Sequence, residues 1–203
     1  MEYLIKKHVP AGELYLIQTT NGKKYWEKVY KNPEKGLGFY LADLGNTQQL
    51  GYAIGIFPFV NFPLSPGRKF KLYVRAGDGI GIITKPYQRT KNHKNNINGS
   101  YINQFIYLRL NSLFYPAKNV RMETGIGLTH LSNGNWAVPN FGINIATINM
   151  GLSFHDYQSS SVKQQVPNDT TYRNIKLKPF FTLVASAGPN ELNHRNGKKY
   201  GAY

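Results

Sequence analysis

Hydrophobic and polar residues alternate along several long stretches of this chain. Between residues 119 and 132 the odd positions from Arg121 to Thr129 are charged or small, whereas the even positions are largely apolar and include Val120, Met122, Ile126 and Leu128. Successive side chains of a β-strand point to opposite faces, so this period of two predicts a strand with one apolar face. The same alternation recurs in residues 68–83, 101–114, 143–155 and 175–187. The pattern predicts an all-β, antiparallel protein.

The apolar face could point in either of two directions. In a soluble sandwich or lipocalin-like barrel it would face a core, and in an outer-membrane barrel it would face lipid while the polar face lines the interior. Several runs reach 12 to 16 residues, longer than the roughly 5–6 residues of ordinary globular strands. They exceed the roughly 9–11 tilted residues that cross a bilayer. We therefore favour an up-and-down transmembrane barrel of about eight or more strands and keep the soluble barrel as an alternative.

The connections between these segments fit such a barrel in part. Residues 62–67 and 115–119 predict tight turns on one rim, and the longer stretches 84–100 and 132–142 lie on the opposite rim. The loop 156–174 departs from this rule because it is long and falls on the short-turn rim. The lysine-rich residues 19–36 predict a cap or helix near the barrel mouth.

Composition narrows the chemistry. The chain has no cysteine, which excludes disulfides and thiolate chemistry, and it has no run of 18 apolar residues that would predict a transmembrane helix. Its net charge of +15 suggests an anionic partner: nucleic acid, a phospholipid surface or the phosphates of lipopolysaccharide. The basic residues are dispersed and not interleaved with aromatics on one face, which argues against nucleic acid. The basic stretch 85–96 fits either lipid phosphates or plain solvation.

We expect residues 1–203 to form a single β-barrel domain, with residues 1–36 partly a cap or irregular. The N-terminus lacks the apolar core of a signal peptide, so an exported protein would here be processed or truncated. The final GKKYGAY resembles a strand that has just begun, which predicts a continuation of the chain.

A histidine and a serine close the apolar face of residues 119–132. His130 and Ser132 are two residues apart, so on a strand they point to the same side and can form a hydrogen bond. Such a histidine can take the proton that a serine nucleophile must lose. The plain alternative is a polar hairpin tip, because Asn-Gly follows directly and His and Ser are ordinary at loop edges.

The stretch THLSNGNWAVPNFGIN (129–144) resembles the signature of the PagL-type lipid A 3-O-deacylases, which are acyloxyacyl hydrolase-like outer-membrane proteins. Both His-x-Ser-Asn and Pro-Asn-x-Gly are present at matching spacing, and the resemblance is firm over residues 120–155. QTTNGKKYWEKVY, GFYLADLGN and FVNFP also look like longer members of this family from Bacteroidetes.

The resemblance implies a serine esterase of a Gram-negative outer membrane, with its active site on the outside of the barrel toward the outer leaflet. It assigns Ser132 as nucleophile and His130 as general base, and it places Asn133, Gly134 and Asn140 where oxyanion stabilisation is expected. The third catalytic position, glutamate in well-known members, falls on Asn144. An asparagine can orient the imidazole but cannot stabilise the imidazolium by charge.

The implied substrate is lipid A within lipopolysaccharide, in contact with outer-membrane lipids, without a cofactor and without a nucleic-acid partner. His8, His93, His155 and His194 show no metal-ligand spacing, so we expect no metal. Asp78 falls in phase with an apolar face, and we interpret it by a β-bulge at the neighbouring glycines. The rival hypotheses are a catalytically inactive structural or adhesive barrel and a soluble anion-binding barrel. Homodimerisation is left open.

Overall fold

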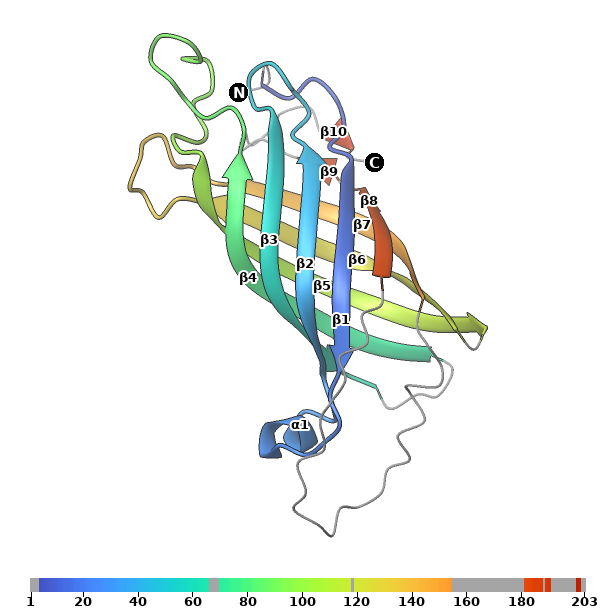
Figure 1. Ribbon diagram of the computed structural model, residues 1–203. Coiled ribbons are helices and arrows are strands. Elements are labelled where there is room, and N and C mark those ends of the chain that lie inside the picture. The colour runs from blue at the N-terminus through green and yellow to red at the C-terminus, as the bar shows by residue number, and fades with distance from the viewer. Residues whose placement is uncertain are drawn as a thin grey trace.

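Eight antiparallel strands form a closed barrel in the computed structural model, and the last strand pairs with the first. The structure describes residues 4–65, 70–117, 119–154, 181–187, 189, 190, 200 and 201. Neighbours in sequence are neighbours in the wall, as Figure 1 shows. The predicted all-β up-and-down barrel is confirmed. The strands of the wall are β1 (Ala11–Thr19), β2 (Glu34–Asp43), β3 (Tyr52–Pro63), β4 (Phe70–Ile83), β5 (Ile102–Ala117), β6 (Val120–Ser132), β7 (Ile143–Phe154) and β8 (Phe181–Ala187).

The elements outside the wall are short. Helix α1 (Tyr25–Val29) lies in the connection between β1 and β2, within the range that predicted a cap or helix. Strands β9 (Pro189–Asn190) and β10 (Tyr200–Gly201) pair in a separate two-stranded sheet. Among the residues described, no helix has the length and apolar character needed to cross a membrane.

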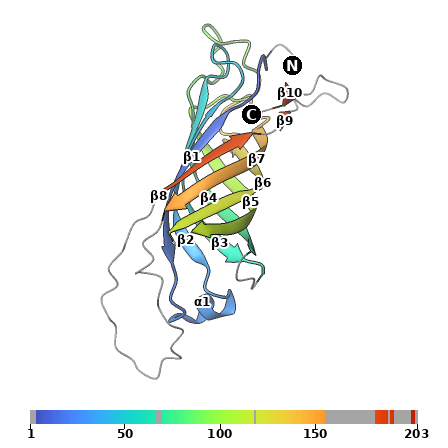
Figure 2. The same cartoon turned by 90° about the vertical axis from the view of Figure 1, so that its right-hand side faces the viewer.

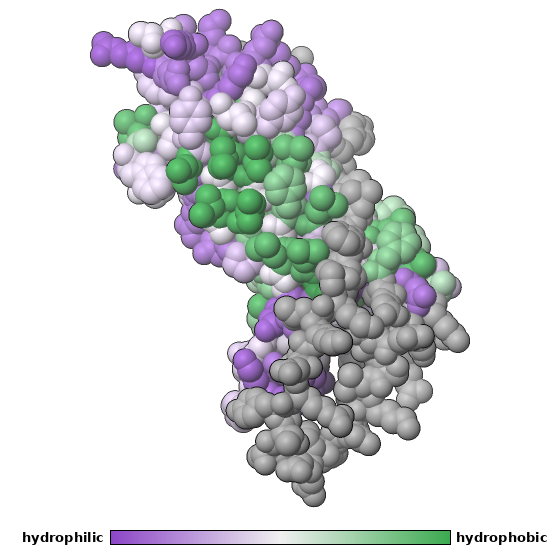
Figure 3. Space-filling view, viewed as in Figure 1, coloured by the Kyte–Doolittle hydropathy of each residue, from purple (hydrophilic) through white to green (hydrophobic). Residues whose placement is uncertain are grey.

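The outward face of the wall is apolar. On β5, β6 and β7 the outward side chains of Leu108, Ile126, Ile148 and Met150 are between 48% and 63% exposed. Hydrophobic residues form a band across the middle of the face seen in Figure 3, with hydrophilic residues above it. A globular protein in water seldom exposes so large a contiguous apolar surface. The alternation in the sequence therefore points its apolar side outward.

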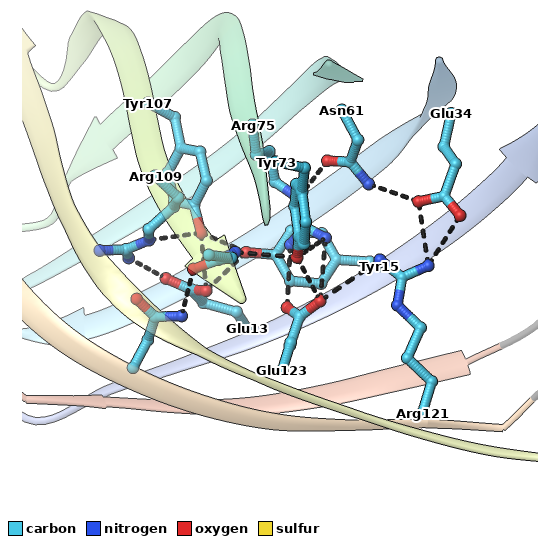
Figure 4. A network of polar contacts seen from close by, with 12 residues as sticks. Glu13, Tyr15, Glu34, Asn61, Tyr73, Arg75, Tyr107, Arg109, Arg121 and Glu123 are labelled. Carbon is cyan, nitrogen blue, oxygen red and sulfur yellow. Dashed lines mark hydrogen bonds and ion pairs between the residues drawn. The ribbon is translucent and has the colours of Figure 1, made fainter. Parts of the chain in front are cut away.

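The inward face holds charged residues that pair across the barrel (Figure 4). Arg75 on β4 donates to Glu123 on β6 at 3.3 Å, and Arg109 on β5 donates to Glu13 on β1. Arg121 on β6 donates to Glu34 on β2 at 2.8 Å. Buried charges are tolerated only when they are paired and hydrogen-bonded. The Arg109–Glu13 and Arg121–Glu34 pairs join opposite walls of the barrel, whereas Arg75 and Glu123 lie on the two strands that flank β5.

Aromatic rings fill the interior beside β1 to β3. The rings of Phe57 and Phe105 stack with centroids 4.9 Å apart, and Tyr40 packs against Phe105. Gly38 pairs with Phe57 in the ladder, and a Cβ on Gly38 would lie 2.5 Å from that ring. On β1 and β3, large apolar residues lie on both faces: Tyr15 and Phe57 are buried inside, and Leu14 and Ile56 are exposed outside. The hydrophobic contrast between the two faces of β1 and β3 is therefore weak, and the period of two does not stand out in their sequences.

The loops gather at two ends as predicted. The connections after β4 and β6 lie at one end of the barrel, and Figures 1 and 2 show α1 at the other. The long connection 156–174 and the start of the predicted segment 175–187 lie outside the described residues. The predicted β-bulge at Asp78 is wrong, because β4 pairs with β5 in unbroken register from Phe70 to Ile82.

Candidate active site

His130 and Ser132 lie at the end of β6, and their side chains are on the outer surface of the barrel. Strand periodicity puts both on the face that carries Ile126 and Leu128. His130 Nε2 lies 2.9 Å from Ser132 Oγ, which is a hydrogen-bond distance. The two residues predicted as a pair are therefore in contact.

Asn144 completes a chain of hydrogen bonds. It is the first outward-facing residue of β7 and pairs directly with His130 in the β6–β7 ladder. Its Oδ1 lies 2.6 Å from His130 Nδ1. In a neutral imidazole, a proton on Nδ1 would donate to this oxygen and leave Nε2 to accept from the serine hydroxyl. This tautomer is the one that a general base needs.

Gly142 leaves room for the imidazole. Its φ of +73° lies in the left-handed region that L side chains rarely adopt. A Cβ there would lie 2.9 Å from His130 Cε1. The glycine of the Pro-Asn-x-Gly motif therefore turns the chain into β7 and keeps the ring position free.

The loop between β6 and β7 is held by asparagine side chains. The Asn133 N–H donates to Asn140 Oδ1 at 3.0 Å, and Asn133 Nδ2 donates to the Ala137 carbonyl at 2.9 Å. The backbone N–H and the side-chain amide of Asn133 are therefore both hydrogen-bonded within the loop between β6 and β7. Among the described residues, neither the Gly134 N–H nor the amide NH₂ of Asn140 makes a hydrogen bond to another group. These donors remain available for a ligand.

A family model, described as lipid A 3-O-deacylase (PagL), matches residues 11–153 of the chain, from β1 almost to the end of β7. The chain belongs to this family. No curated protein and no solved structure matches the chain.

Family membership agrees with the fold. The lipid A 3-O-deacylases are hydrolases, and they are β-barrels of the outer membrane. The apolar outer face is the surface that such a barrel turns to lipid, and the ionic interior is its polar side. The soluble alternative of the sequence analysis is therefore wrong.

The structure of this deacylase family member also shows contacts that the sequence did not indicate. The loop between β4 and β5 packs against the loop between β6 and β7. The Phe141 N–H donates to the Ile97 carbonyl at 2.9 Å, and the backbones of Asn98 and Asn140 pair in an antiparallel arrangement. Asn95 and Asn98 are buried, and their side chains hydrogen-bond within the β4–β5 loop. An asparagine-rich stretch is usually taken as a solvated loop, so only the density of Asn residues in 92–98 could have drawn attention to it.

Proposed function

We propose that this protein removes the 3-O-linked acyl chain of lipid A by a serine esterase mechanism. The observation that carries the proposal is the continuous hydrogen-bonded chain from Ser132 through His130 to Asn144 on the outer surface. A polar triad on an apolar, lipid-facing wall is expensive unless it has a role. An enzyme whose substrate is itself a membrane lipid has a reason to hold its nucleophile there.

Acylation begins with attack of Ser132 Oγ on the acyl carbonyl carbon while its proton passes to His130 Nε2. The carbonyl π electrons move to oxygen and form a tetrahedral oxyanion. When this intermediate collapses, the bond from the carbonyl carbon to the sugar oxygen breaks. The sugar oxygen takes the proton from His130 and leaves as a hydroxyl.

Deacylation repeats the sequence with water. His130 accepts a proton from the water as it attacks the acyl-serine, and collapse of the second intermediate returns that proton to Ser132 Oγ. The fatty acid is released and the site is regenerated. Each step needs only groups of this chain and water.

The oxyanion is expected to bind the Gly134 N–H and the Asn140 amide. Both donors lie in the loop that directly follows Ser132, and neither has a partner among the described residues. Preorganised donors of this kind stabilise charge that develops only in the transition state. Asn133, the third residue of the predicted group, instead supports the loop through its two hydrogen bonds.

The acyl chain has an apolar path beside the triad. Leu108, Ile126, Leu128, Ala146 and Ile148 line a shallow groove on the outer face of β5 to β7. Leu128 is the outward residue of β6 that immediately precedes His130. A chain in this groove would stay within the apolar band while its ester reaches Ser132.

The test uses the full chain in detergent with purified lipopolysaccharide, followed by mass spectrometry of lipid A. We expect loss of one hydroxyacyl mass with the wild type and intact lipid A with Ser132→Ala. Ser112→Ala is the matched control, because Ser112 is also on an outward face but donates to the Thr124 carbonyl away from the triad. Intact lipid A with the wild type would favour the inactive barrel.

A further inference from the structure

A second polar pair lies on the outer face of the barrel next to the triad. Asp78 on β4 and Gln104 on β5 are both exposed, and Gln104 Nε2 donates to Asp78 Oδ1 at 3.2 Å. Their outward neighbours along the same strands are the exposed Ile80, Ile82, Ile102 and Ile106. Placing a carboxylate in an apolar band that faces lipid costs free energy, so such a residue usually has a function.

The strand register connects this pair to the candidate site. Gln104 pairs directly with Ser132 in the β5–β6 ladder. Asp78 pairs with Ile106, which in turn pairs with His130. With strands about 4.8 Å apart, Gln104 flanks the nucleophile and Asp78 lies about 10 Å from His130 along one row of the sheet. The five polar residues from Asp78 to Asn144 thus occupy two adjacent rows across four strands.

The chemistry of the pair is that of an acceptor. Asp78 forms no ion pair with any residue that the structure describes. An ionised carboxylate only accepts hydrogen bonds, and the Gln104 amide carbonyl adds a further acceptor. Such a site attracts hydroxyl and amide N–H groups and repels phosphate.

We propose that Asp78 and Gln104 bind the hydroxyl and amide N–H groups of the substrate sugar next to the scissile ester, and so select saccharide esters over glycerophospholipids. The proposal rests on the proposed function, since it orients the ester over Ser132. Asp78 and Gln104 are positioning residues, because they act on the sugar and not on the reacting atoms. In a glycerophospholipid the acceptor pair would meet a phosphodiester near the ester and would disfavour it.

Kinetics with two substrates test this role. The full chain in detergent is assayed with lipid A and with a short-chain p-nitrophenyl ester, which has no sugar. Because hydrogen bonds to a charged group are among the stronger ones, Asp78→Leu is expected to raise KM for lipid A about tenfold or more, and Gln104→Leu to raise it less. The value of kcat for lipid A and the hydrolysis of the small ester are expected to stay within about twofold.

Thr124→Val is the matched control, because Thr124 is a polar residue on the outward face of β6 and pairs with Ser112 far along the strand from His130. It should leave both substrates unchanged. Asp78→Leu should also increase the hydrolysis of phosphatidylglycerol relative to lipid A. Equal losses on the sugar and sugar-free substrates would indicate a merely structural pair, and an unchanged KM for lipid A would overturn the proposal.

Binding separates failure of this inference from failure of the proposed function. Lipid A binding is measured with Ser132→Ala, with and without Asp78→Leu. If the wild type cleaves no ester but Asp78→Leu still weakens binding of lipid A, the sugar site stands and the deacylase does not. If binding is unaffected while the wild type deacylates lipid A, the deacylase stands and the sugar site does not.

Discussion

Asn144 faces His130 across the β6–β7 ladder, and its Oδ1 lies 2.6 Å from His130 Nδ1. An amide in this place can orient an imidazole without adding charge. In the proposed mechanism, the imidazolium formed during acylation would gain no ionic partner from Asn144. Three substitutions at and around this contact separate orientation, charge and oxyanion stabilisation.

Asn144→Ala should lower kcat by about 100-fold with little change in KM, because the imidazole loses the group that sets its tautomer and angle. Asn144→Asp should raise kcat about fivefold, since a charge-assisted hydrogen bond stabilises the imidazolium. Steady-state kinetics on lipid A measure both. If the Ala variant retained wild-type kcat, Asn144 would have no orienting role.

Asn140→Asp should lower kcat by about 100-fold while leaving the site loop in place. The variant keeps an oxygen for the Asn133 N–H but loses the amide donor that is expected to meet the oxyanion. Comparison with Asn140→Ala, which removes both, distinguishes the two functions. Equal activity of Asn140→Asp and the wild type would exclude this side chain from oxyanion stabilisation.

Gly142→Ala should displace the His130 ring. The added Cβ would lie 2.9 Å from Cε1, and the positive φ adds a strain of about 1 kcal/mol. We expect kcat to fall about 100-fold. Gly12→Ala is the control on β1, since a Cβ there meets nothing within 4 Å. Full activity of Gly142→Ala would show that the ring has more freedom than the contact allows.

Glu123→Ala should destabilise the barrel by about 3–5 kcal/mol in urea unfolding, because Arg75 and Arg121 lose a buried counter-charge. The double variant Arg75→Met with Glu123→Leu removes one charge of each sign and should be less destabilised. The single variant folding as stably as the wild type would contradict this account of the interior.

Much of this architecture could be predicted from alternation alone. Strands β4 to β7 can be recognised in the sequence because their outward faces are apolar, whereas their inward faces carry charged or small residues such as Arg75, Arg109 and Glu123. Strands β1 and β3 show weaker alternation, since the large residues Tyr15 and Phe57 lie on their inward side. Partner identity across the lumen, as between Glu13 and Arg109, depends on barrel closure and has no local signal.

The candidate site likewise contains features that the sequence predicts and features that only the folded loop determines. His130 and Ser132 share a face by strand period, so their contact follows from spacing, and the Asn144 position followed from the resemblance and from its phase in residues 143–155. The engagement of Asn133 within its own loop could not be inferred, because a loop conformation decides which amide donors remain free. The sequence predicts a β-bulge at Asp78 because it does not show that β4 and β5 pair in unbroken register there.

The ionic pairs that cross the lumen also have an electrical consequence. Arg109 reaches Glu13 and Arg121 reaches Glu34 across the barrel, and Arg75 pairs with Glu123 inside it, so the space that is a water-filled pore in a porin is occupied by paired side chains. The protein inserted into a planar bilayer should therefore add no measurable ion conductance. In the proposed reaction, lipid substrate, water and fatty acid would then arrive and leave along the outside of the wall.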